Sequence, residues 1–214
     1  MKGIIVCEES QAVTSAFNDA GHDFYSCDLQ DCGGSQPEKH IKGDAIEALT
    51  GKTHNWQFVG AHPPCDFSAN SGVRWLTSEK PRNGYIFSNA LNIYVNPERW
   101  DAMEEMAKFF KTIYGIIKEI GKGYMEQPII HKYAQNIIGV KPTQIVQPWM
   151  FGHGEVKPTC LWLIGLPKLK PTNIVSGREQ KIWKMPPSPD RKKLRSKTYP
   201  GIAEAMVQQW VYHP

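Results

Sequence analysis

The chain has 214 residues, of which 41% are hydrophobic and 21% charged, an ordinary composition for a globular protein with one sizeable core. It contains no apolar run near the ~18 residues that a membrane span requires, and its net charge of +4 is too small to indicate a nucleic-acid partner by itself. The five cysteines lack zinc-site spacing, which predicts reduced thiols, a cytoplasmic location and no structural metal.

Strand and helix signals alternate along the chain, which predicts one domain with an α/β fold and a mostly parallel sheet. The N-terminal residues 3–7 are predicted to form a strand rather than a signal peptide. Ser10 is expected to cap the helix that follows, which Gly21 ends. Further strands are predicted at 23–28, 40–44 and 57–62.

The second half of the chain continues this alternation after an irregular segment. Residues 77–98 have no regular period and contain several turn signals, so we expect an inserted loop or lid there. An apolar stripe from Trp100 to Ile117 predicts a long helix that ends near Gly121. The elements expected after it are strands at 124–128, 144–147 and 159–164, and helices at 132–138 and 202–211.

The segment Pro63-Pro64-Cys65 directly follows the apolar residues 58–61. Two prolines fix φ and lack backbone donors, so the strand must stop and the next side chain is held in a rigid loop. In an open α/β sheet, ligands bind at this carboxyl edge. Cys65 is therefore a candidate nucleophile, and the alternative is a free cysteine that packs as a small hydrophobe.

Glu126 ends the predicted strand 124–128 in a similar way, just before Pro128. Two strand ends on one edge of a sheet can face a common cleft. An acid beside a thiol suits addition to an activated ring, where the thiol attacks and the acid protonates the ring nitrogen or hydrogen-bonds to it. The alternative for Glu126 is an exposed acid, and His62 either polarises the site or hydrogen-bonds the loop.

Residues 178–197 concentrate positive charge, with eight basic side chains, two acidic ones and Trp183. A segment of this kind either contacts phosphates or forms a solvated surface loop. The candidates for phosphate contact are Arg191, Lys192, Lys193 and Arg195.

Several motifs resemble those of the DNA cytosine-5 methyltransferases, and they occur in that family's order. Pro63-Pro64-Cys65, with Gly72 seven residues on, resembles the nucleophile motif, and Glu126-Gln127-Pro128 is similar to the Glu-Asn-Val or Glu-Asn-Pro motif. Residues 151–159 look like a degenerate Phe-Gly motif with its Gln-x-Arg-x-Arg segment, and residues 199–203 resemble the last motif. The whole chain is similar to small bacteriophage and prophage proteins of this family.

The resemblance implies a class I, Rossmann-like methyltransferase fold, S-adenosylmethionine as cofactor and DNA as partner. Cys65 would add to C6 of a cytosine while Glu126 engages N3 and the exocyclic amine, so that C5 accepts the methyl group. The implied cofactor-binding residues are Glu8, Ser10, Asp28, Asp44, His62 and Pro63. The implied substrate-binding residues are Pro64, Ser68, Gly72, Lys157, Thr159, Arg191, Lys192, Lys193 and Arg195.

Some features depart from the family pattern. The first loop, residues 7–12, has no glycine where the family has Phe-x-Gly-x-Gly, and the arginines of Gln-x-Arg-x-Arg are missing. Only a short basic loop, residues 171–197, stands in place of a target-recognition region, so little sequence specificity is expected. Asp28 and Asp44 are equally compatible with cap or turn roles.

Two other functions remain open from the sequence. One is an enzyme that modifies C5 of a free pyrimidine nucleotide, for which a folate-borne one-carbon unit is conceivable. The other is a catalytically idle protein that binds nucleic acid or a nucleotide. The sequence leaves the oligomeric state undetermined.

Overall fold

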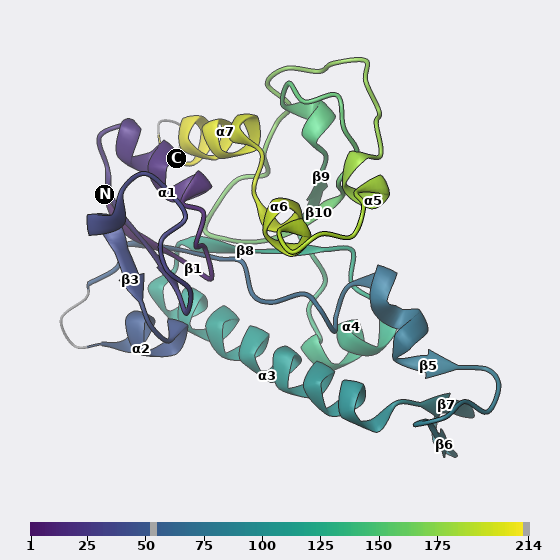
Figure 1. Ribbon diagram of the computed structural model, residues 1–214. Helices are drawn as coiled ribbons and strands as arrows, with labels where there is room; N and C mark the ends of the chain where they lie inside the picture. The colour runs from purple at the N-terminus through teal and green to yellow at the C-terminus, as the bar shows by residue number, and fades with distance from the viewer. Residues whose placement is uncertain (52–54, 212–214) are drawn as a thin grey trace.

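The computed structural model describes residues 1–51 and 55–211. Its centre is a sheet with helices on both faces (Figure 1). In the described part of the chain this sheet has seven strands, in the order β3-β2-β1-β4-β8-β10-β9. They are β1 (Lys2–Val6), β2 (Asp23–Asp28), β3 (His40–Lys42), β4 (Phe58–Ala61), β8 (Gly123–Pro128), β9 (Gln144–Val146) and β10 (Thr159–Ile164).

The strand order runs outward from β1 in both directions, with β2 and β3 on one side and β4 and β8 on the other. These pairings are parallel, whereas β10 lies antiparallel between β8 and β9. The arrangement confirms the predicted α/β fold and gives the Rossmann-like, class I methyltransferase-like order that the resemblance implies. In a sheet of this kind, ligands bind outside the carboxyl ends of the strands where the order reverses, here β1 and β4.

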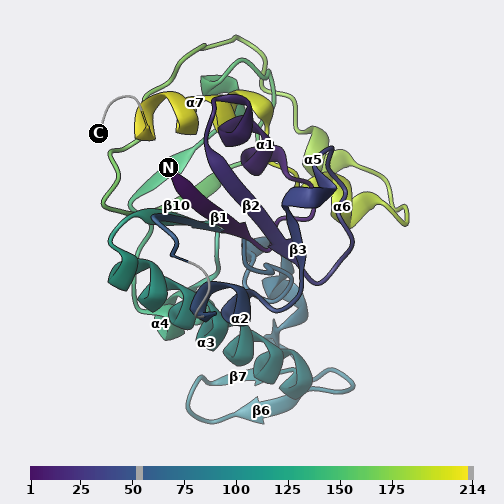
Figure 2. The same cartoon turned by 90° about the vertical axis from the view of Figure 1, so that its left-hand side faces the viewer.

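Helices α1 and α7 cover one face of the sheet, and α2, α3 and α4 cover the other (Figures 1 and 2). Their bounds are α1 (Ala12–Asp19), α2 (Ala45–Thr50), α3 (Pro97–Ile120), α4 (Lys132–Ile138) and α7 (Pro200–Trp210), and the short 3-10 helices are η1 (Pro37–Lys39), η2 (Asn70–Trp75) and η3 (Pro148–Met150). Among the described residues, no helix has the length and apolar character needed to cross a membrane.

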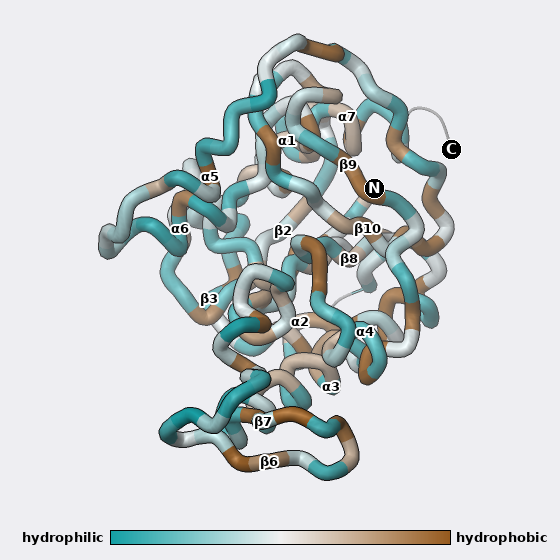
Figure 3. The backbone as a smooth tube through the Cα atoms, turned by 90° about the vertical axis from the view of Figure 1, so that its right-hand side faces the viewer, coloured by the Kyte–Doolittle hydropathy of each residue, from teal (hydrophilic) through white to brown (hydrophobic). Residues whose placement is uncertain are grey.

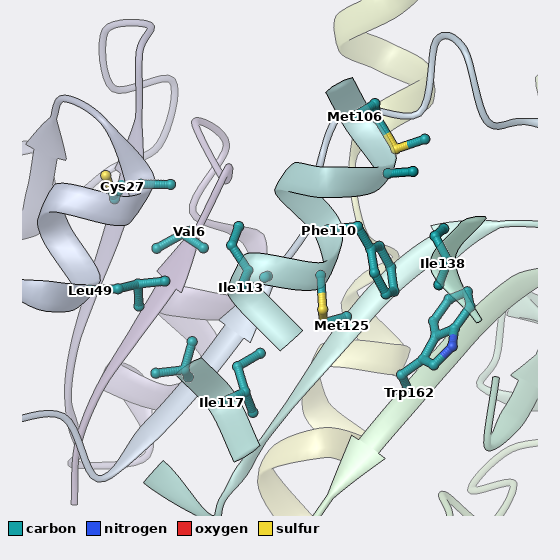
Figure 4. Close-up of a cluster of buried hydrophobic side chains, with 14 of the residues drawn as sticks. Val6, Cys27, Leu49, Met106, Phe110, Ile113, Ile117, Met125, Ile138 and Trp162 are labelled. Carbon is teal, nitrogen blue, oxygen red and sulfur yellow. The ribbon is translucent and has the colours of Figure 1, made fainter. Parts of the chain in front are cut away.

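Side-chain alternation along the strands divides the core into two clusters. Val6 and Met125 pack on the α3 side, where they face Phe110 and Ile113 of that helix (Figure 4). Tyr124, one residue before Met125, belongs instead to the cluster under α1 and α7. The same alternation places Glu126 on the α7 side of the sheet and Gln127 on the α3 side.

Helix α3 forms as predicted and ends at Gly121 as expected, but it begins at Pro97, before the predicted stripe. The Asn96 side chain accepts a hydrogen bond from Arg99 N–H, Pro97 occupies the first turn, and Gly121 ends the helix with φ of 82°. Helix α1 begins differently from the prediction, because Ser10 does not cap it. The Glu8 carboxylate accepts the N–H groups of Val13 at 2.6 Å and Thr14 at 3.2 Å instead.

Residues 77–98 are not a structureless loop. They contain β5 (Thr77–Ser78), β6 (Ile86–Ser88) and β7 (Ile93–Val95), which form a separate antiparallel sheet in the order β5-β7-β6. Residues 70–95, here called the arm, project from the body of the protein (Figures 1 and 2). These apolar runs are too short for a strand period to be recognised, which is why the sequence predicts a loop.

The basic segment also contains helical turns where a loop was expected. These are α5 (Lys181–Lys184) and α6 (Arg191–Ser196). Figure 2 shows both on the side of the molecule where β2 and β3 end.

Candidate functional site

Residues 62–69, here called the nucleophile loop after the candidate nucleophile Cys65, follow β4 and are held by two buried side chains, Gln127 of β8 and His131 at the N-cap of α4. Gln127 Nε2 donates hydrogen bonds to the carbonyl oxygens of Pro63 at 2.5 Å and Pro64 at 3.4 Å. The Ser68 hydroxyl donates to Gln127 Oε1 at 2.8 Å, and His131 Nε2 lies 2.8 Å from the Phe67 carbonyl oxygen. The loop that carries Cys65 is therefore fixed in place.

His131 is a neutral imidazole in this arrangement. Its Nδ1 accepts the Ala134 N–H at 3.2 Å and so caps α4, which leaves the proton on Nε2 for the Phe67 carbonyl. Burial lowers the pKa of His131, which favours the neutral form. Sequence reasoning missed both clamps: it considered Gln127 only as a replacement for asparagine, and it did not consider His131.

Cys65, Glu126 and Lys157 lie near enough to shift one another's pKa. The pKa of Cys65 is raised to about 11, chiefly by burial and next by the charge of Glu126, while Lys157 opposes the rise. Burial also raises the pKa of Glu126 and lowers that of Lys157, and in each case the other residue of this pair opposes the shift. The structure thus brings together the two predicted catalytic residues and one predicted substrate-binding residue.

A cavity of about 10 Å³ lies beside Glu126, which is enough space for about one water molecule. The residues that line this cavity include Lys157 and the buried Thr159. Tyr199, which precedes α7, and Ile202 of α7 also line it. The Thr159 hydroxyl donates to the Lys157 carbonyl oxygen at 3.1 Å, and Lys157 Nζ donates to the Lys197 carbonyl oxygen at 2.9 Å. The Tyr199–Ala203 segment therefore closes over the acid.

His62 hydrogen-bonds within the protein. Its Nε2 lies 2.7 Å from the Tyr124 hydroxyl, and its backbone N–H donates to the Val6 carbonyl oxygen at 3.0 Å. Burial, together with Lys157, lowers the pKa of His62 to about 3. This imidazole stays neutral at neutral pH, which favours the structural alternative over a role in polarising the thiol.

The first loop adopts a tight turn without glycine. Cys7 and Gln11 have φ of 59° and 55°, a left-handed conformation that is rare for such residues and costs about 1 kcal/mol each. Gln11 is fully buried and holds its conformation by hydrogen bonds from Nε2 to the Gln36 carbonyl at 2.8 Å and to the Ser26 hydroxyl at 3.1 Å. Strain of this kind occurs preferentially at functional sites, so the loop after β1 is a candidate site.

The two acids of this loop have different surroundings. Glu8 is buried, and its oxygens accept the α1 N–H groups and the Thr14 hydroxyl. Glu9 is also buried, with 8% of its surface exposed, but neither of its carboxylate oxygens accepts a hydrogen bond. Its charged partner is Lys193 of α6, 3.4 Å away, and the carboxylate lies against Gly33, where a side chain would clash with it.

The other predicted cofactor-binding residues are partly engaged within the protein. Asp44 is the N-cap of α2, and its Oδ1 accepts the N–H groups of Ile46 and Glu47. Asp28 Oδ1 accepts the Gln30 N–H at 3.0 Å, a turn of the kind that the sequence left open. Pro63 is buried, whereas Ser10 is only half-buried.

The predicted substrate-binding residues fall into two groups. Pro64 is exposed and Gly72 half-buried near the nucleophile loop, whereas Ser68 is fully buried and hydrogen-bonded to Gln127.

The second group lies on α6. Lys192 pairs with Asp66 at 2.7 Å, and Lys193 pairs with Glu9. Arg195 lies close enough to Lys157 to lower the pKa of that lysine. Arg191 Nε donates to the Met185 carbonyl at 2.9 Å. Helix α6 thus bridges the loops after β1 and β4.

The comparisons with known proteins include a distant structural likeness. No family model matches the chain, and no curated protein matches it. A solved structure of a "putative DNA modification methyltransferase" encoded within an E. coli prophage is 11% identical, with a TM-score of 0.46. The match covers 87% of this chain and 55% of that one, so the chain spans about half the length of that protein.

Proposed function

We propose that this chain is an S-adenosylmethionine-dependent methyltransferase that modifies C5 of cytosine in DNA through a covalent adduct with Cys65. The observation that carries the proposal is the pairing of Cys65 and Glu126 at neighbouring strand ends, electrostatically coupled to each other and to Lys157. A ring that is attacked at one atom and protonated at another needs a thiol and an acid in this relation.

The protonation states of the pair suit this chemistry. Burial raises the pKa of Glu126, which favours the protonated acid that a ring nitrogen could receive a proton from. A neutral Glu126 also removes one negative charge that raises the pKa of Cys65, and the Lys157 cation stabilises the thiolate. Protonation of Glu126 therefore makes ionisation of Cys65 less unfavourable. The hydrogen bonds of Gln127 hold the loop that carries the thiol. Ser68, which donates to Gln127, is proposed to position this loop rather than to bind substrate.

The residues of the first loop fit an S-adenosylmethionine cofactor, which supplies the methyl group when bound. The buried Glu9 carboxylate accepts no hydrogen bond, so it is suited to receive the cofactor's ammonium group. We assign this role to Glu9 rather than to Glu8, because the oxygens of Glu8 already accept hydrogen bonds from α1. The second oxygen of Asp28 is suited to a ribose hydroxyl. Asp44 acts through its cap, which fixes the loop that follows β3.

The direct test is methyl transfer by the Cys65→Ser variant. With labelled S-adenosylmethionine and duplex DNA, we expect the wild-type protein to label cytosine and the variant to lose turnover while keeping its fold and cofactor affinity. Wild-type turnover by Cys65→Ser would overturn the mechanism. Transfer to deoxycytidine nucleotides, with none to DNA, would favour the free-nucleotide enzyme, and absence of cofactor binding would favour an idle binding protein.

A further inference from the structure

Arginine side chains on and beside the arm are stacked on aromatic rings. The Arg82 guanidinium lies 5.0 Å from the centre of the Trp75 ring and 5.1 Å from that of Tyr85, and Arg74 lies 5.2 Å from the Trp75 ring. Arg99, at the start of α3, stacks over Phe67 of the nucleophile loop at 4.9 Å. The stacked groups thus run from the arm to within two residues of Cys65.

These cations have no acidic partners within the part of the chain that the structure describes. None of its ion pairs involves Arg74, Arg82 or Arg99, and the buried Nε of Arg99 has no hydrogen-bond partner. Like charges gathered without a counterion repel one another, so a bound anion would stabilise the group. A guanidinium over a ring still has N–H groups with which it can make a planar, bidentate contact with phosphate.

The arm also exposes an aromatic and apolar surface. Trp75 is 44% exposed, and Ile86, Phe87 and Leu91 are exposed as well. Figure 3 shows apolar positions along β6 and β7, on a projection that lies outside the body of the protein. Aromatic rings beside unpaired arginines form the combination that binds bases by stacking and phosphates by charge.

We infer that Arg74, Trp75, Arg82 and Arg99 form a nucleic-acid contact surface, with the arginines binding the phosphates of the strand beside the nucleophile loop and Trp75 stacking on an unpaired base. The inference rests on the proposed function and deepens it, because it assigns strand binding to the arm in addition to the basic segment that the sequence predicts. Tyr85 fixes the geometry, since its hydroxyl donates to the Trp75 carbonyl oxygen at 2.7 Å.

The test measures the affinity of the full chain for a fluorescent single-stranded oligodeoxynucleotide and for its duplex over a range of salt concentrations. The double variant Arg74→Ala/Arg82→Ala should bind at least about tenfold more weakly, with a log–log salt slope flatter by about 1.4–1.8, because each lost phosphate contact removes about 0.7–0.9. Trp75→Ala should weaken single-strand binding more than duplex binding and leave the slope unchanged, because stacking releases no counterions.

Two further variants isolate the stacked geometry. Arg74→Lys/Arg82→Lys keeps the charges and should keep the salt slope while binding more weakly, because lysine has no planar fork. Lys111→Ala/Lys118→Ala removes two exposed charges from α3 and should bind like the wild-type protein. Equal affinity and slope in the Arg74/Arg82 alanine variant would overturn the inference.

Calorimetry with S-adenosylmethionine separates this inference from the proposed function. In one outcome, the wild-type protein binds the cofactor and methylates DNA, and the alanine variants bind DNA equally well. The assignment of DNA binding to the arm is then wrong, and the proposed function stands. If the wild-type protein binds cofactor but no nucleic acid, both the arm surface and the DNA substrate are wrong.

Discussion

Glu9 and Lys193 form a long ion pair, 3.4 Å, at the carboxyl end of β1. Mutations of these two residues are expected to change the affinity for S-adenosylmethionine in opposite directions. Glu9→Gln removes the charge that would bind the cofactor's ammonium, a charge-assisted hydrogen bond worth about 1.5–3 kcal/mol, so affinity should fall at least about tenfold. Lys193→Ala removes a competing cation and should strengthen binding. Titration calorimetry measures both effects.

A matched control for Glu9 is Glu38→Gln, an exposed acid in η1, which should bind S-adenosylmethionine like the wild-type protein. Unchanged affinity in Glu9→Gln would remove Glu9 from the cofactor site. Weaker binding in Lys193→Ala would show that Lys193 contacts the cofactor rather than competing with it.

Glu8 makes the stability of the protein depend on pH. Burial raises the pKa of Glu8 to about 7 from an ordinary 4.5. Between these values the folded state holds a proton that the unfolded state has released, so this group's stabilisation is complete below about pH 4.5 and is lost as the pH rises through about 7. The loss amounts to about 1.4 kcal/mol for each unit of pKa difference, or about 3 kcal/mol in all.

The measurement is urea unfolding of the wild-type protein and of Glu8→Gln at pH 5 and pH 8. The free energy of unfolding should fall more steeply with rising pH in the wild-type protein, by about 2–3 kcal/mol, because the variant has no proton to lose. Glu38→Gln should follow the wild-type curve. Parallel curves for the wild-type protein and Glu8→Gln would show that Glu8 ionises normally in the folded state.

At the scale of elements, the nucleophile loop depends on contacts from β8 and α4. Gln127→Ala would leave the Pro63 carbonyl and the Ser68 hydroxyl without their buried partner, which costs about 1–3 kcal/mol. We expect this loss in the free energy of unfolding and a larger fractional loss in kcat than in cofactor affinity. Ser68→Ala removes only one of these hydrogen bonds, so it should lose less of the free energy of unfolding and less of kcat.

Urea unfolding and single-turnover methylation measure these effects. Lys132→Ala, on α4 beside the His131 clamp, replaces an exposed side chain and serves as the control. A stable Gln127→Ala protein with full turnover would show that the loop keeps its shape without the clamp.

The regular elements could be predicted because their periods are local. The strand at 23–28 and the helix at 132–138 were predicted at their observed bounds, and Pro97, Asn96 and Gly121 account for the ends of α3. The cap of α1 could not be predicted in the same way. Ser10 has the right type for an N-cap, but the Glu8 carboxylate reaches the helix N-terminus because the left-handed turn at Gln11 displaces Ser10.

Contacts between distant parts of the chain account for the rest of the site. Cys65 and Glu126 could be proposed from sequence because Cys65 follows a strand and two prolines, and Glu126 lies near the end of a strand that closes with Pro128. Their coupling to Lys157 and the clamp by Gln127 arise from the register of β4, β8 and β10, which pairs Ala61 with Met125 and Leu161 with Glu126. The bond between Lys192 and Asp66 spans 126 residues, and composition alone cannot indicate it.

At the scale of the whole molecule, the doubly wound sheet brings the loops after β1 and β4 to one edge, and α6 bridges them through Glu9 and Asp66. The arm lies on the other side of the nucleophile loop and carries the stacked arginines. Substrate binding is thus proposed to involve two basic elements, α6 and the arm, that approach Cys65 from separate parts of the chain.

The central claim is that Cys65 forms a covalent bond with a cytosine base, and trapping on DNA that contains 5-fluorocytosine tests it most directly. Release of the thiol requires removal of a proton from C5, and a fluorine in place of that hydrogen cannot be removed in this way. The adduct therefore persists after methyl transfer and can be measured by intact mass spectrometry. The account predicts an adduct with the mass of the protein, the oligonucleotide and one methyl group, located at Cys65 and missing in Cys65→Ser. A wild-type protein that methylates cytosine DNA but forms no adduct with the fluorinated substrate would contradict it.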